Sequence, residues 1–304
     1  MENQNKIKLD ASLAGPLFML SAALLFTALN IIIKLMKPEY TVWHIGFFRF
    51  FGSILVLFAV FGRKSNPYRG KNVRLLITRG CVGSVAFISM VTAIRLLPVS
   101  TALVIFYTYP AFAAIAAFII FRERLGKHEI ACVILVIAGV SVLFDFKVSL
   151  NLTGQLFALL SAAFAGVTIT LIRTLRKVNG PVIIYLYFCT MGTIVTLPMF
   201  IKNPILPATS AEWVMILGII FCSISAQLLM NQGFFYCRGW EGGVFMSCEA
   251  VFTAILGIVF LGDPVSWRFW TGGLIIFSCV VALNRFKSDK PEKEGQNIST
   301  FNSN

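Results

Sequence analysis

Charge is scarce in this sequence. Only 13% of the 304 residues are charged, which is about half of the roughly 25% that a soluble domain carries. Hydrophobic residues make up 58% of the chain, and the mean hydropathy is +0.83. The composition excludes an ordinary soluble domain and indicates a chain that lies mostly within a lipid bilayer.

Residues that support catalysis or metal binding are also few. The two histidines, His44 and His128, lie far apart in the chain, and neither a His-Glu-x-x-His motif nor a P-loop occurs. The seven cysteines are odd in number and show no metal-ligand spacing. We therefore expect no enzyme, no cofactor and no metal ion.

The net charge of +13 does not indicate a nucleic-acid-binding protein. A nucleic-acid footprint would gather Lys and Arg on one soluble face, whereas here these residues stand between apolar runs. Positive charge that alternates with apolar runs is typical of membrane topology. The expected partners are a lipid bilayer and a small-molecule substrate, with no nucleic acid.

Apolar runs of about 20 residues, the length of a spanning helix, fill the chain from Gly15 to Leu283. The predicted fold is an all-α integral membrane protein with ten transmembrane helices at 15–36, 43–62, 75–96, 99–121, 129–145, 154–174, 181–201, 213–235, 243–261 and 267–284. With a cytoplasmic N-terminus, most of the 26 Lys and Arg residues fall on the cytoplasmic side, so the positive-inside rule places both termini there.

The two halves of the chain resemble each other. Gly15-Pro-Leu-Phe-Met-Leu-Ser-Ala-Ala aligns with Gly154-Gln-Leu-Phe-Ala-Leu-Leu-Ser-Ala-Ala. We expect an N-terminal segment 1–13, a first repeat 14–145, a second repeat 153–285 and a disordered tail 286–304. Because five helices per half is an odd number, the second repeat is inverted, which is typical of transporters that work by alternating access.

Three motifs support a resemblance to a known family. Pro98-Val-Ser-Thr-Ala-Leu-Val-Ile-Phe-Tyr-Thr-Tyr-Pro-Ala-Phe, followed by Arg122-Glu-Arg-Leu-Gly, resembles the helix-four signature of the EamA family of the drug/metabolite transporter superfamily. Ser247-Cys-Glu-Ala-Val-Phe and Leu261-Gly-Asp resemble its counterpart in the second half, with Ala and Asp at the positions where Pro and Glu are usual. Phe47-Phe-Arg-Phe-Phe is similar to the helix-two pattern.

The resemblance implies secondary transport of a small organic metabolite such as an amino acid, nucleoside or vitamin. Similarity to short-tailed bacterial members implies a cell inner membrane. The short segment from Thr92 to Ala102 also resembles the S-adenosylmethionine uptake branch. A passive channel or a membrane receptor is the alternative function. Substrate identity, import or export, the coupling ion and a homo-oligomeric state are left open.

Glu249 is the one acidic residue well inside a predicted span. Such a carboxylate costs about 2.5–3.5 kcal/mol to insert, so it needs a partner, a cavity or water. It is the first candidate for proton coupling or for binding a cationic substrate group. The alternative is a static ion pair or a hydrogen-bonded carboxyl group.

Arg49 lies inside the predicted second span, at a depth about 10 Å from that of Glu249, a gap that side-chain reach nearly closes. It is a candidate to pair with that carboxylate or to hold a substrate carboxylate, and a structural arginine is the alternative. Arg79, in the third span, is predicted to be an interfacial anchor.

Pro110 interrupts the backbone hydrogen bonds of the predicted fourth span, and lipid cannot satisfy the carbonyl that it exposes. The fourth span is therefore predicted to be kinked and to line the pathway. Tyr107 and Tyr109 flank the kink and either contact substrate or pack. Ser247 occupies the counterpart region of the ninth span.

Gln227 and Asn231 are four residues apart and share one face of the predicted eighth span. Their amides either line a solute cavity or bond neighbouring helices. Asn30 in the first span is a further candidate that is expected to make interhelical bonds, and His44 is expected at the membrane interface.

Overall fold

The computed structural model describes residues 11–62, 68–121, 151–236, 239–262 and 270–275, with a few further positions between 131 and 142 and at 267 and 278. Most of these residues are helical, and no strand occurs among them. The helices are α1 (Ala11–Leu35), α2 (Val42–Phe61), α3 (Val73–Leu96), α4 (Val99–Phe106), α5 (Tyr109–Phe121), α7 (Leu152–Arg176), α8 (Pro181–Lys202), α9 (Ser210–Tyr236) and α10 (Gly239–Leu261).

Within the described residues, seven helical segments are long and apolar enough to cross a membrane. Their outer faces carry exposed large apolar side chains, among them Leu55, Ile194 and Phe221, as expected where lipid replaces water. The protein is therefore a multi-pass membrane protein. The predicted span 243–261 coincides with α10, whereas most of spans 129–145 and 267–284 lies outside the described residues.

The predicted span 99–121 is broken, not merely kinked. Tyr107 and Thr108 separate α4 from α5. Pro110 has no N–H to bond the carbonyl four residues earlier. The amide and hydroxyl of Thr108 both donate to the carbonyl of Ile105, at 3.1 and 2.8 Å. This tight local bonding ends α4 and turns the chain before α5 begins.

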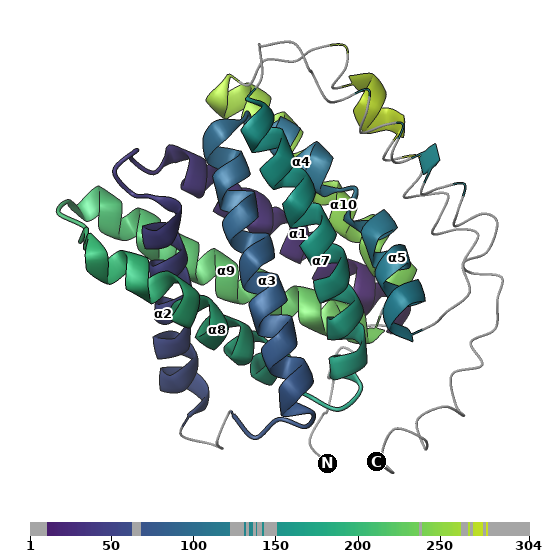
Figure 1. Cartoon of the computed structure of the whole chain (residues 1–304), viewed down its shortest axis with the longest axis horizontal. Helices are drawn as coiled ribbons and strands as arrows, with labels where there is room; N and C mark the ends of the chain where they lie inside the picture. The colour runs from purple at the N-terminus through teal and green to yellow at the C-terminus, as the bar shows by residue number, and fades with distance from the viewer. Residues whose placement is uncertain are drawn as a thin grey trace, which may run out of the picture.

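Helices of the two halves pack in pairs. In Figure 1, α3 and α7 run side by side through the centre, α2 and α8 lie at the left, and α5 lies at the right. The C-terminal end of α8 meets the N-terminal end of α2, where His44 Nε2 bonds the carbonyl of Asn203 at 2.6 Å. The start of α7 likewise meets the end of α3, because a Cβ on Gly154 would lie 2.8 Å from Leu97.

The ends of α1 and α3 cap each other. Lys34 of α1 donates to the carbonyls of Ile94 and Leu97, at 2.9 and 2.7 Å. Arg95 of α3 donates in return to the carbonyls of Met36, Lys37 and Tyr40, at 2.6, 2.7 and 2.8 Å. The last carbonyls of a helix lack intrahelical donors and carry a partial negative charge. Lys34 therefore stabilises the end of α3, and Arg95 stabilises the turn that follows α1.

Glycines bring helices into close contact where the halves meet. A Cβ on Gly166 of α7 would lie 2.6 Å from the backbone nitrogen of Ala113 in α5, and one on Gly192 of α8 would lie 2.4 Å from the ring of Phe50 in α2. Small residues permit such approach, which drives helix association in membranes. The same packing leaves a cavity between the two halves.

Candidate functional site

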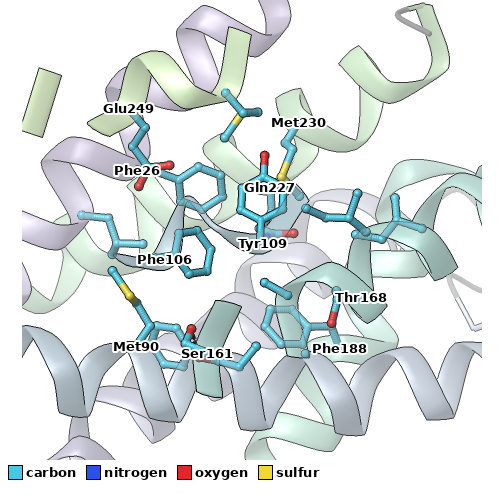
Figure 2. A pocket seen from close by; sticks show the side chains of 18 of the residues that line it. Phe26, Met90, Phe106, Tyr109, Ser161, Thr168, Phe188, Gln227, Met230 and Glu249 are labelled. Carbon is cyan, nitrogen blue, oxygen red and sulfur yellow. Dashed lines mark hydrogen bonds between the residues drawn. The ribbon is translucent and has the colours of Figure 1, made fainter. Parts of the chain in front are cut away.

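A cavity of about 140 Å³ lies between helices of both halves. Figure 2 shows it from close by. Its lining residues are Phe26, Leu29, Asn30, Arg49, Arg79, Gly83, Ala86, Phe87, Met90, Val91, Leu103, Phe106, Tyr107, Tyr109, Ser161, Ala165, Thr168, Ile169, Ile172, Phe188, Gln227, Met230, Phe234, Met246 and Glu249. Most of this wall is aromatic or aliphatic, with a few polar groups, which is the usual composition of a ligand site.

Glu249 of α10 lies on one side of the cavity, near Phe26 in Figure 2. Its side chain is 4% exposed. Oε1 accepts a hydrogen bond from Asn30 Nδ2 at 2.9 Å, and Oε2 contacts the Tyr107 hydroxyl at 2.8 Å. Three helical segments that are far apart in sequence thus converge on one carboxyl group.

The break between α4 and α5 positions the Tyr107 hydroxyl. This hydroxyl contacts the backbone carbonyl of Met246 as well as Glu249 Oε2. A carbonyl can only accept, and a phenol has one hydrogen to donate. Of the two contacts, therefore, the hydroxyl donates to only one.

Threonines reinforce the contact between α1 and α10. The hydroxyl of Thr27 donates to the carbonyl of Ala23 at 3.0 Å and approaches the carbonyl of Glu249 at 3.4 Å. Thr253 of α10 donates to the Thr27 hydroxyl at 3.1 Å. These bonds hold the backbone of Glu249 against α1, close to Asn30.

Arg49 of α2 also lines the cavity, but the predicted pair with Glu249 is not formed. Its Nε donates to Ser223 Oγ at 2.5 Å, and Tyr185 bonds the same Ser223 hydroxyl at 2.8 Å. The guanidinium lies 3.8 Å from the ring centroid of Phe87, a cation–π geometry. Arg49 therefore joins α2, α3, α8 and α9.

Arg79 was predicted to be an interfacial anchor, and that prediction is wrong. Its side chain is 1% exposed and lines the cavity. Nη2 donates to Gln227 Oε1 at 3.3 Å, and the guanidinium lies 4.2 Å from the ring centroid of Phe188. A Cβ on the neighbouring Gly80 would lie 2.9 Å from the carbonyl of Tyr187, so α8 packs closely against this part of α3.

The remaining candidate residues fall into those that line the cavity and those that do not. Tyr109 and Gln227 line the cavity, whereas Asn231 and Pro110 do not. Asn231 instead bonds helices, because its Nδ2 donates to the carbonyl of Pro181 at 3.4 Å. The side chain of Ser247 lies outside the described residues.

His44, which was expected at the membrane interface, is 2% exposed. Its Nδ1 lies 2.7 Å from the Thr41 hydroxyl, and its Nε2 bonds the carbonyl of Asn203. Its ring therefore links the start of α2 to the residue that follows α8.

Sequence reasoning missed several cavity residues besides Arg79. Thr168, Ser161 and Phe188 line it, yet nothing in their local sequence separates them from other small or aromatic residues of spanning helices. Glu249 and Asn30 were identifiable because polar side chains are rare in apolar spans.

An apolar helical bundle that crosses the membrane several times, with buried charged groups around an internal cavity, has the features of a membrane transporter. The sequence matches the EamA-like transporter family over residues 13–145 and 152–285. The chain belongs to this family, within the drug/metabolite transporter superfamily.

Individual relatives agree with this assignment. The chain is 25% identical to the pseudopaline exporter CntI of Pseudomonas aeruginosa over 289 residues, which cover 92% of this chain and 99% of the relative. It is 24% identical to human solute carrier family 35 member G1, with 93% and 81% coverage. A solved crystal structure with 16% identity matches with a TM-score of 0.62 over 91% of this chain and 99% of the other, which supports the fold alone.

Proposed function

We propose that this protein is a secondary transporter that moves a small organic metabolite across the membrane by alternating access, with Glu249 as the proton-coupling group. One observation carries the proposal. Glu249 is buried at a cavity lined by both halves, and its partners Asn30 and Tyr107 come from the opposite half. A group that links two bodies across a substrate cavity can couple its own protonation to their movement.

The proposed architecture is ten helices in two inverted repeats, 14–145 and 153–285, between a cytoplasmic segment 1–13 and a cytoplasmic tail 286–304. The bond from His44 to Asn203, which joins the start of α2 to the end of α8, supports inversion. So does the ion pair of 2.5 Å between Lys37, just after α1, and Glu212 in the first turn of α9. The proposed location is a cell inner membrane.

Hydrogen counting favours a protonated Glu249 in this conformation. If the Tyr107 hydroxyl donates to the carbonyl of Met246, its contact with Glu249 Oε2 needs a hydrogen from the carboxyl group. A neutral carboxyl group also avoids the cost of a charge in an apolar cavity. Release of this proton would leave the carboxylate competing with Met246 for one phenolic hydrogen.

The relatives support an organic cargo. One is named for the export of pseudopaline, and another is a solute carrier. The narrow, largely apolar cavity also suits a small organic molecule more than a hydrated ion. Neither relative establishes the substrate or the direction of transport for this chain.

Counterflow in proteoliposomes tests the function. Vesicles loaded with one unlabelled solute from a panel of amino acids, nucleosides, vitamins and S-adenosylmethionine should accumulate the labelled form transiently and saturably. Linear, non-saturating flux would instead indicate a passive channel. No counterflow with any panel member or with extracted metabolites would reject the carrier mechanism.

Glu249→Gln tests the coupling. The variant should still exchange substrate, but its net transport should no longer respond to an imposed pH gradient. Glu39→Gln, at an exposed loop position, is the matched control and should behave as wild type. Proton-driven accumulation that persists in Glu249→Gln would exclude Glu249 as the coupling group.

A further inference from the structure

We infer that Arg79 is the anchor for a carboxylate group of the transported molecule. The inference rests on the proposed function and adds a substrate class to it: a small organic acid or zwitterion whose carboxylate meets Arg79 within the cavity. Arg79 lies on the cavity wall, in the first half, with its charge directed at no protein carboxylate among the described residues.

Two donor nitrogens of Arg79 lack partners. Nε and Nη1 are buried and make no hydrogen bond, and only Nη2 is engaged, by Gln227. Buried polar groups are nearly always paired, and an unpaired donor on a cation is the most costly kind. A site that tolerates this arrangement is best explained by a ligand that supplies the acceptors.

Stacking on Phe188 does not meet this need. The guanidinium carbon lies over the Phe188 ring, 4.2 Å from its centroid, and a contact between an N–H group and a ring face is much weaker than a hydrogen bond to a carboxylate. Gly83 keeps the space near one of them open, because a Cβ there would lie 3.4 Å from Nη1. Phe188 thus orients the guanidinium and leaves donors available for hydrogen bonding.

The charge balance of the cavity indicates an anionic ligand group. Arg49 and Arg79 both line it and both approach the Phe188 ring, at 5.6 and 4.2 Å. Glu249 is the one carboxylate on the described wall, and it is bonded by Asn30 and Tyr107, not by either arginine. The site is therefore positive overall, and a carboxylate would neutralise it.

The wall offers a further hydroxyl for such a ligand. Thr168 Oγ1 is buried, lines the cavity and makes no hydrogen bond. In Figure 2, Thr168 and Phe188 lie on the side of the cavity away from Glu249. If the carboxylate of a ligand binds Arg79, the other end of the same molecule would therefore lie near Glu249.

The cavity volume limits the size of useful probes. A buried cavity of about 150 Å³ accommodates benzene, which is close to the 140 Å³ found here. Acetate and benzoate are therefore suitable carboxylates, and acetamide and benzamide are their uncharged matches. All four are tested on the full-length protein in detergent at constant ionic strength.

The first test compares two buried arginines without ligand, in a buffer free of carboxylates. Arg176 is the matched control, because its Nε, Nη1 and Nη2 all donate, to Asn231, Asn179 and Gln232. Arg176→Met should lower the melting temperature by about 5 °C or more. Arg79→Met should match or exceed wild type. A loss in Arg79→Met as large as that in Arg176→Met would show a structural arginine and overturn the inference.

The second test is selectivity. At tenfold above its dissociation constant, at least one carboxylate should raise the melting temperature of the wild type by about 2–4 °C, and its amide should not. Arg79→Met should abolish the shift, and Arg74→Met, at an exposed position of the same helix, should retain it. Equal effects of acid and amide, no effect of either acid, or a shift that survives Arg79→Met would each overturn the inference.

These binding tests separate the inference from the proposed function. Carboxylate binding through Arg79 without counterflow would reject the carrier mechanism and keep the anion site. Counterflow of a solute without a carboxylate, unaffected by Arg79→Met, would keep the carrier mechanism and reject the anion site.

Discussion

Glu249→Gln should leave the protein about as stable as wild type, and this outcome depends on where the hydrogens lie. A glutamine has the shape of a protonated glutamate, with a carbonyl oxygen that accepts and an amide that donates. Its oxygen can accept from Asn30, and its amide can donate to the Tyr107 oxygen while that hydroxyl donates to Met246. Every bond of the protonated site is kept.

The magnitudes follow from the bonds lost. Glu249→Gln should change the free energy of unfolding by less than about 0.5 kcal/mol, because it removes no bond. Tyr107→Phe removes the one hydroxyl that serves both Met246 and Glu249, which should cost about 1–3 kcal/mol. At about 2–4 °C per kcal/mol, Tyr107→Phe should melt at least a few degrees below wild type.

Thermal unfolding of the two single variants and the double variant, in the same detergent at neutral pH, measures these differences. If Glu249 were ionised in the wild type, Glu249→Gln would remove a buried charge together with its charge-assisted hydrogen bonds, so its melting temperature would differ clearly from that of the wild type. That result would refute the hydrogen assignment and, with it, a protonated carboxyl group in this conformation.

Two further predictions concern contacts between helices. Hydrogen bonding to Glu212 raises the pKa of Lys37 above 10.5, and the same bond lowers the pKa of Glu212 from 4.5 to about 2. This pair should therefore stabilise the fold between about pH 4.5 and 10.5, and its effect should be lost as pH rises through the higher folded pKa of Lys37. Lys37→Met should melt below wild type at neutral pH, and a difference in melting temperature that stays constant at alkaline pH would contradict the pairing. Gly166→Val should lower the free energy of unfolding by about 1–3 kcal/mol through overpacking, because its Cβ would lie 2.6 Å from the Ala113 nitrogen. Gly218→Val is the control, because its Cβ would meet one side-chain methyl at 3.2 Å, and it should lose less stability in the same melting assay. Equal losses of stability in the two variants would show that the close approach at Gly166 does not limit packing.

Much of the described fold could be predicted from the sequence, because spanning helices are recognisable by the length of their apolar runs. The site around Glu249 was partly predictable for a related reason. A polar group in hydrocarbon must find a partner among the few others available, and Asn30 and Tyr107 were among those few. The pairing itself was not predictable, because it depends on how far α4 continues before it breaks.

Arg79 shows why the rest could not be predicted. Arginines near a helix end can reach the membrane surface or turn inward, and the local sequence is the same in both cases. In this structure α8 packs closely against Gly80 and Gly83, and Arg79 lies between the Phe188 ring and Gln227. The glycines are visible in the sequence, but the helix that occupies the space beside them is not.

The reciprocal caps of Lys34 and Arg95 have a mechanical consequence. They tie the ends of α1 and α3 together through several hydrogen bonds, whereas the α-helical hydrogen-bond ladder is interrupted at the junction of α4 and α5. Asn30 belongs to the tied helix α1, and Tyr107 lies at the interrupted junction. When the cavity opens, we expect the carboxyl group of Glu249 to part from Tyr107 first and from Asn30 last.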